Sequence, residues 1–215
     1  MTLLQPFVDR HVILSLEKQF RLFDVIGERD WSADLEAGTL SFAAPKRRLR
    51  RGEPPIEMGI ALLGTEAEGS WLWGWANPGG FPEPIVAAGR AVGDYGREHD
   101  LAPLYEPESP VDDDVTLERI GIVAAGALDL KATYTGPAGD ARVLFGLDDP
   151  RLELPPFDAA RLLTVLTHLI QTGLVRDWPA ALAAYEQARG VELDGVVEIE
   201  LDDLGRVTNL RSQLG

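Results

Sequence analysis

The stretch Ser70-Trp71-Leu72-Trp73-Gly74-Trp75-Ala76-Asn77 holds three of the five tryptophans in the chain, spaced two residues apart. Side chains of a β-strand alternate between its two faces, so a strand over residues 71–76 places Trp71, Trp73 and Trp75 on one face. A helix would scatter the same rings around its axis. The stretch therefore predicts a strand with one strongly aromatic face.

Further strands are predicted on both sides of this stretch, and they come in adjacent pairs. The strand before the tryptophans covers residues 56–63, and the glycines and glutamates of residues 64–69 form the turn between the two. Other short apolar runs around turn residues predict strands over 31–35 and 39–42, 128–134 and 141–147, and 195–201 and 206–210. Neighbouring strands that pair through short turns form an antiparallel sheet.

Helices separate these hairpins. Apolar residues spaced by three and four predict a helix over 3–26, one from 84 to about 99 and one that runs through residues 120–127. A fourth helix, introduced by Pro155 and Pro156, ends near Gly173, and a fifth covers 179–189. Asp112, Asp113 and Asp114 are expected to cap the third helix, and residues 103–110 are expected to form a loop. The fold class is therefore α+β: an antiparallel sheet built from hairpins and covered by helices, in the order α-ββββ-αα-ββ-αα-ββ. We expect residues 1–215 to form a single globular domain.

The amino-acid composition argues against several kinds of partner and site. The chain has 215 residues, a formal net charge of −15 and no cysteine. The negative field opposes binding to nucleic acid, and the absence of thiols excludes disulfides and thiolate metal sites. The first twenty or so residues are interrupted by charges and lack the pattern of a signal peptide. We expect a cytoplasmic protein that binds no membrane, and the scarcity of lysine beside arginine suggests a bacterial gene.

The three tryptophans have two interpretations. Aligned on one face, they suit an aromatic ligand or a protein interface. A helix packed over the strand would instead bury them in the core, which is the usual place for large apolar side chains and the interpretation that we favour.

Residues for catalysis or metal binding are sparse. His11, His99 and His168 lie far apart in the sequence and form no metal-binding spacing. The basic cluster at residues 46–51 suits an anion or an acidic partner segment, but it is equally typical of a solvated loop. The aspartate triplet at residues 112–114 and the aspartate pairs at 148–149 and 202–203 are typical of caps and turns. We therefore expect no cofactor and no metal, and we assign no catalytic residue.

The tryptophan strand and its surroundings resemble an uncharacterised bacterial family, a domain of unknown function whose hairpin ends in a TWLWAWAN-like strand. The resemblance also includes residues 62–65, 124–127 and 134–137, and covers roughly residues 31–173. Gly74 replaces the usual alanine, and Thr133 stands where a second tyrosine is common. The resemblance implies a shared fold unit and no mechanism.

The function expected from these observations is binding or protein interaction without catalysis, with a protein partner or a second copy of the chain. The alternative is a small-molecule binder or an enzyme whose pocket lies beside the tryptophan strand. The candidate ligand or interface residues are Trp71, Trp73, Trp75, Asn77, His99 and Tyr134.

Overall fold

A computed structural model describes residues 2–44, 54–203 and 205–212 of the chain. Its helices are α1 (Gln5–Ile26), α2 (Glu83–Glu98), α3 (Ala102–Tyr105), α4 (Leu117–Ala127), α5 (Ala159–Thr172) and α6 (Trp178–Arg189), with 3-10 turns η2 (Gly74–Ala76) and η3 (Pro150–Leu152). Its strands are β1 (Trp31–Asp34), β2 (Thr39–Phe42), β3 (Ile56–Ala67), β4 (Ser70–Trp73), β5 (Glu108–Pro110), β6 (Ala132–Ala138), β7 (Ala141–Leu147), β8 (Val197–Leu201) and β9 (Val207–Ser212).

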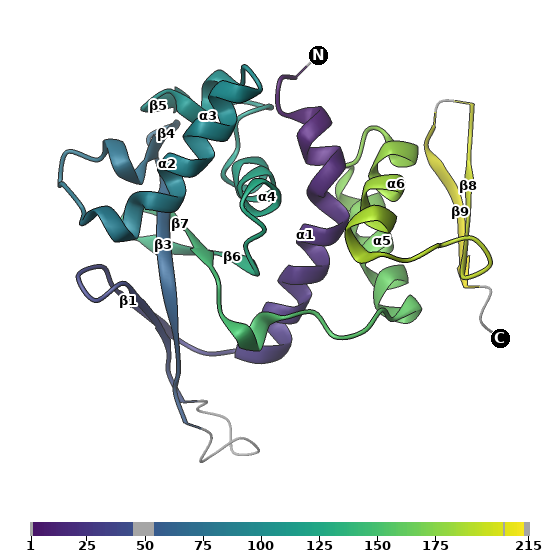
Figure 1. Ribbon diagram of the computed structural model, residues 1–215, viewed down its shortest axis with the longest axis horizontal. Helices are drawn as coiled ribbons and strands as arrows, with labels where there is room; N and C mark the ends of the chain where they lie inside the picture. Colours follow the sequence, from purple (N-terminus) through teal and green to yellow (C-terminus); the bar gives the residue numbers. More distant parts are fainter. Residues whose placement is uncertain (1, 45–53, 204, 213–215) are drawn as a thin grey trace.

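Helix α1 runs through the middle of the molecule (Figure 1). The main sheet and helices α2, α3 and α4 lie on one side of it, and α5, α6 and the β8–β9 hairpin lie on the other. Within the described residues, no helix is both long enough and apolar enough to cross a membrane. Helix α1 therefore contacts both halves of the molecule.

The main sheet has seven strands, and every pairing in it is antiparallel. The first half of β3 pairs with β2, and its second half lies between β4 and β7. Strands β8 and β9 form a separate antiparallel pair. The predicted α+β class with a sheet built from hairpins is therefore confirmed, whereas the single domain stays a prediction.

The β3–β4 hairpin is tighter than predicted. Strand β3 continues to Ala67, and the turn consists of Glu68 and Gly69, whose φ angles are 51° and 78°. Two consecutive positive φ angles are the requirement of a type I′ turn, whose twist matches that of the flanking strands. Thr65 and Glu66, expected in the turn, therefore pair with β4 and β7.

Two predictions around the tryptophans were wrong. The strand expected over residues 71–76 ends at Trp73, and Trp75 lies in the 3-10 turn η2. The loop expected over residues 103–110 contains most of α3 and all of β5. Pairing with β4 holds β5 in place, because Ser109 lies opposite Trp71 and the Trp73 amide donates to the Pro107 carbonyl at 3.1 Å. Such pairing overrides the weak local preference of the segment.

Two apolar clusters form the core. The larger includes Trp71 and Trp73 and joins α1, α2, α3 and α4 to α5 and α6. The smaller packs residues of the sheet, among them Phe42 and Phe145, against the end of α1 and the start of α2. Because the larger cluster contains residues from both sides of α1, apolar packing joins the two sides.

Helix α1 also carries most of the buried polar side chains among the described residues: Gln5, Asp9, Ser15, Glu17 and Lys18 are each at most 9% exposed. Lys18 donates to Asp129 and to the Leu130 carbonyl, both at 2.8 Å, and Glu17 accepts from the Tyr185 hydroxyl at 3.0 Å. Burial raises the pKa of the Glu17 carboxyl above its ordinary value. These bonds connect α1 to the α4–β6 loop on one side and to α6 on the other.

The aspartate triplet does not cap α4 as predicted, and one of its members contacts the start of another helix. Thr116 caps α4 by accepting from the Arg119 amide at 3.2 Å. Asp114 instead accepts from the Leu3 amide at 2.6 Å and the Leu4 amide at 3.2 Å, at the start of α1. A carboxylate there satisfies unpaired amides and the positive end of the helix dipole.

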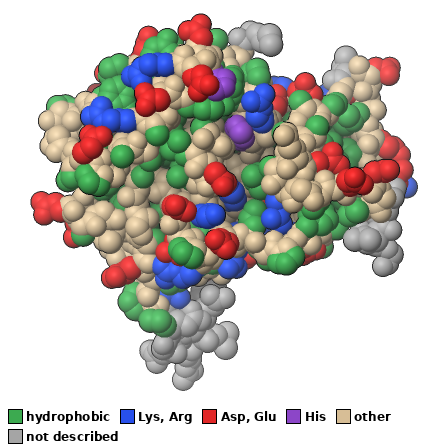
Figure 2. All heavy atoms as spheres, viewed as in Figure 1, with side chains coloured by type: hydrophobic (Ala, Val, Ile, Leu, Met, Phe, Trp, Pro, Cys, Tyr) green, Lys and Arg blue, Asp and Glu red, His purple; other side chains and the backbone are tan. Residues whose placement is uncertain are grey.

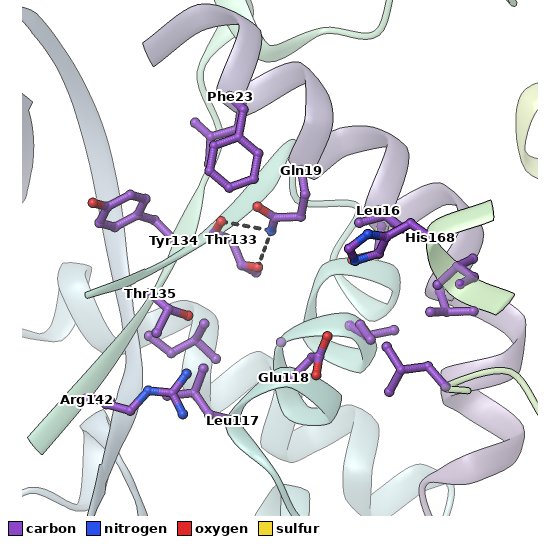
Figure 3. Close-up of a pocket in the computed structure, with 18 residues that line it drawn as sticks. Leu16, Gln19, Phe23, Leu117, Glu118, Thr133, Tyr134, Thr135, Arg142 and His168 are labelled. Carbon is purple, nitrogen blue, oxygen red and sulfur yellow. Dashed lines mark hydrogen bonds between the residues drawn. The ribbon is translucent and has the colours of Figure 1, made fainter. Parts of the chain in front are cut away.

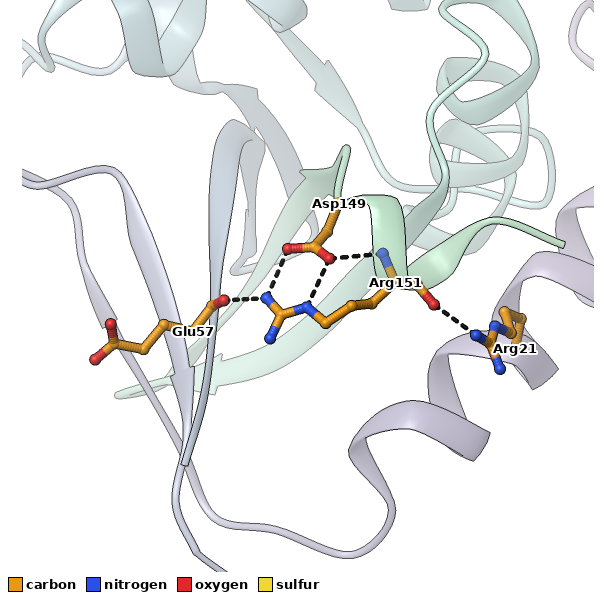
Figure 4. A network of polar contacts seen from close by, with 4 residues as sticks. All are labelled: Arg21, Glu57, Asp149 and Arg151. Carbon is orange, nitrogen blue, oxygen red and sulfur yellow. Dashed lines mark hydrogen bonds and ion pairs between the residues drawn. The ribbon is translucent and has the colours of Figure 1, made fainter. Parts of the chain in front are cut away.

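A charged network fastens the end of β7 to β3 and α1 (Figure 4). The Arg151 guanidinium donates to both oxygens of Asp149, at 2.7 and 2.8 Å, and to the Glu57 carbonyl. Arg21 of α1 donates to the Arg151 carbonyl at 2.8 Å. The hydrogen bonds from Arg151 lower the pKa of the Asp149 carboxyl. The network is explained by its role in holding these elements together.

On the molecular surface, acidic side chains are dispersed among basic ones over the visible face (Figure 2). They are more frequent toward the edge where β8 and β9 lie. The basic cluster at residues 46–51 falls outside the described residues. The negative charge of the chain is therefore not gathered into one large patch on this face.

Candidate functional site

A cavity of about 540 Å³ lies where α1, α4, the β6–β7 hairpin and α5 meet (Figure 3). Its apolar lining comes from all of these elements and from the loop after α5: Val12, Leu16, Leu22, Leu117, Ile122, Leu144, Leu169 and Leu174. On α1 the lining residues recur at three and four, which is the spacing of one helix face. The cavity is therefore a gap between secondary-structure elements.

Polar groups gather on one wall of this cavity. The Gln19 side-chain nitrogen donates to the carbonyl and the hydroxyl of Thr133, at 2.9 and 2.7 Å. These bonds fix the carboxamide, and its oxygen Oε1 has no partner among the described residues. Because Ser15 and Thr133 are buried and also line the cavity, its interior offers hydroxyl groups beside an available acceptor.

Charged and titratable groups lie at the rim. Glu118 and Arg142 are exposed there, and the Arg142 Nη1 lies 3.7 Å from Glu66 Oε1. His168 is exposed on α5, with its ring edge-on to Phe20 at a centroid distance of 6.0 Å. No hydrogen bond joins Glu118, Arg142 and His168 to one another, so the geometry supports binding and identifies no acid–base pair.

Trp71 and Trp73 belong to the core, as we favoured from the sequence. Each is 0% exposed, and their rings meet edge-to-face at a centroid distance of 5.3 Å. Trp73 Nε1 donates to the Pro103 carbonyl at 3.0 Å. Gly64 of β3 makes room for the Trp71 ring, since a Cβ there would lie 2.6 Å from Trp71 Cζ2. Neither ring is open to a ligand from solvent.

Trp75 and Asn77 lie after the strand and do not join the cavity. Trp75 is half-buried, with the Arg90 guanidinium 5.7 Å from its ring centroid, beside a hollow of about 250 Å³. This hollow is smaller than typical ligand pockets. Asn77 Oδ1 accepts from the Gly79 amide at 2.8 Å, which is the contact of an Asx turn.

Of His99 and Tyr134, only Tyr134 lines the cavity. His99 stacks on Tyr95 at a centroid distance of 4.2 Å and lies edge-on to Phe7. Tyr134 borders the cavity, but its hydroxyl points away from Gln19 and Thr133 (Figure 3). Of the six predicted site residues, the structure therefore brings only Tyr134 to the cavity, and it brings no three potential metal ligands together in the described part of the chain.

Gln19 and Thr133 were missed as site residues. Gln19 lies on a helix whose pattern was explained by core packing, and Thr133 lies on a strand of unremarkable composition. A polar residue on the apolar stripe of α1 was the one available signal. Its partner is more than a hundred residues away in the sequence, so local patterns could not have paired them.

Residues 5–150 match a sequence family described as a family of unknown function, DUF6882. The chain belongs to this family. No curated protein and no solved structure matches the chain. The match begins and ends earlier than the predicted resemblance, so it includes α1 and stops before α5. The cavity is thus lined by the family region together with His168, Leu169 and Leu174, which follow it. The bacterial origin stays a prediction, as does the idea that the tryptophan strand marks the family.

Proposed function

We propose that the protein binds a small, neutral, amphipathic organic molecule in the cavity between α1, α4, the β6–β7 hairpin and α5. The observation that carries this proposal is a volume of about 540 Å³ with an apolar lining and polar groups on one wall. Pockets for small molecules have this size and this division of chemistry. The Gln19 Oε1 atom would accept a hydrogen bond from the ligand, because its amide nitrogen is already committed to Thr133.

This proposal takes up the small-molecule alternative but moves its pocket away from the tryptophan strand. Glu118 and Arg142 carry opposite charges at the rim, which favours a neutral ligand over an ion. The protein partner, the absence of catalysis and the cytoplasmic location stay predictions from the sequence.

The test uses N-phenyl-1-naphthylamine, a neutral amphipathic dye whose fluorescence rises in apolar surroundings. Gly121 of α4 lines the cavity, and a Cβ there would lie 3.5 Å from Leu144 Cδ1 and 3.6 Å from Thr133 Oγ1. Gly121→Leu would therefore fill the space, whereas Gly121→Ala would add a methyl group at ordinary contact distance. Ser15→Leu would fill the space from α1.

We expect saturable dye binding by the wild type and by Gly121→Ala. We expect dye binding by the folded Gly121→Leu and Ser15→Leu variants to be at least about tenfold weaker. Circular dichroism checks that each variant is folded. Equal binding by wild type and both filled variants would refute the proposed site.

A further inference from the structure

A second cavity, of about 1090 Å³, lies beside the N-terminal half of α1, the start of α4 and one face of α6. Gln5 and Asp9 line it from α1, and Arg119 lines it from α4. Leu174 lines both this cavity and the first one. The two cavities therefore lie near each other along α1, but their linings differ in chemistry.

Arg119 is the central feature of the second cavity. It is 8% exposed, and its Nη1 donates to Gln5 Oε1 at 2.8 Å. Among the described residues, no carboxylate oxygen lies within 4.0 Å of a guanidinium nitrogen of Arg119, so Arg119 forms no ion pair there. By contrast, Arg151 pairs with Asp149 and the largely buried Arg189 pairs with Glu17. A buried cation without a counterion is unfavourable, so the guanidinium that borders this cavity is suited to receive an anion.

Gln5 links Arg119 to Asp9, a buried carboxylate that lines the same cavity. The Gln5 side-chain nitrogen donates to Asp9 Oδ1 at 2.9 Å, and the same oxygen accepts from the Arg176 amide at 2.8 Å. The Gln5 carboxamide therefore stands between the two charges. It uses one of the five N–H groups of Arg119 and leaves others to a ligand.

The exposed charges around the cavity balance one another. Arg10 and Arg176 carry positive charge, and neither forms an ion pair within the part of the chain that the structure describes. Asp113 and Asp177 carry negative charge, and Asp177 caps α6 by accepting from the Ala180 amide at 3.0 Å. The rim is thus nearly neutral. Inside the cavity Arg119 and Asp9 both lack an ion-pair partner among the described residues, but the Asp9 carboxylate accepts two hydrogen bonds whereas the Arg119 guanidinium donates one.

We propose that the second cavity binds the carboxylate group of a small organic acid, with Arg119 as its principal donor. The planar guanidinium matches the two oxygens of a carboxylate. Asp9 opposes a second negative charge in the same space, which favours a monoanionic carboxylate over a phosphate dianion. This site is separate from the cavity of the proposed function and does not depend on it.

The experiment measures binding of benzoate by isothermal titration calorimetry, at constant ionic strength maintained with chloride. Arg119→Gln removes the buried charge. Arg211→Gln is the matched control, because Arg211 lies exposed on β9 away from the cavity and bonds Asn209 at 3.2 Å. We expect saturable binding by wild type and Arg211→Gln, and roughly tenfold weaker binding by Arg119→Gln.

A second measurement uses the wild type alone, in case Arg119→Gln does not fold. Addition of benzoate should shift the amide NMR resonances of Gln5, Arg119 and Arg176 and leave that of Arg211 unchanged. No saturable binding by the wild type, equal binding by folded Arg119→Gln, or tighter binding of inorganic phosphate than of benzoate would each overturn the proposal.

Discussion

Trp73 shows how a single side chain sustains the fold. Its ring is 0% exposed within the larger apolar cluster, and its Nε1 has a carbonyl partner in the segment before β5. We expect Trp73→Ala to lower the free energy of unfolding by about 3 to 5 kcal/mol, because a large cavity and an unpaired carbonyl remain. Urea unfolding followed by circular dichroism measures this change.

Trp75→Ala is the matched comparison for this prediction. The Trp75 side chain is half-buried, and its Nε1 has no hydrogen-bond partner among the described residues, so its removal should cost less. Equal losses for the two substitutions would contradict the distinction between a core tryptophan and a tryptophan in the turn η2.

His11 gives the stability of the protein a dependence on pH. Burial, followed by the charges of Arg10 and Lys18, lowers its pKa from 6.5 to about 4. The unfolded chain therefore takes up the proton first as the pH falls. The contribution of His11 to stability is complete above pH 6.5 and is lost progressively toward pH 4, by no more than about 3 kcal/mol.

His11→Met separates this effect from other titrating groups. Methionine has a similar size and no charge, so the variant should lose less stability than the wild type between pH 6.5 and pH 4. Denaturant unfolding at several pH values measures both profiles. Parallel profiles would show that His11 does not titrate differently in the folded and unfolded chains.

At the scale of elements, helix α4 contains two glycines whose substitution by alanine should change the stability of the protein in opposite directions. Gly126 lies against His11, and a Cβ there would be 2.1 Å from His11 Cγ, whereas the space at Gly121 accepts a Cβ at ordinary contact distance. Gly121→Ala should stabilise the protein by about 0.5 to 1 kcal/mol through helix propensity. Gly126→Ala should destabilise it by about 1 to 3 kcal/mol because the histidine must move. Thermal unfolding of both variants decides this, and a gain in stability for Gly126→Ala would refute the packing of His11 on α4.

How far the elements could be predicted depended on where their stabilisation comes from. Helix α1 was found from periodicity, because its pattern follows its own buried face. Strand β7 was found as a short apolar run beside turn residues, whereas the strand expected over residues 128–134 shares only residues 132–134 with β6. Strand β5 has three residues and depends on pairing with β4, so its local sequence carried no signal. Similarly, Asp114 was expected to cap the helix next to it, but it caps the start of α1 more than a hundred residues away.

At the scale of the whole molecule, α1 organises both proposed sites. The first cavity is lined by Leu16 and Gln19 of α1, and the second by Gln5 and Asp9 of the same helix. Each cavity needs elements from both sides of α1, and part of each lining follows the family region. Local sequence patterns identify the elements but not the spaces between them. The spacing of the tryptophans therefore predicted a candidate site, whereas no local pattern predicted a role for Gln19.

The most direct test of the central claim is to map N-phenyl-1-naphthylamine on the protein by methyl NMR. We predict that the dye shifts the methyl resonances of Leu16, Ile122, Leu144 and Leu169, which line the first cavity, and gives NOEs to them. The methyl groups of Val92 and Leu104, near the buried tryptophans, should be unaffected. Shifts confined to the tryptophan region, or no shifts at saturating dye, would contradict the account.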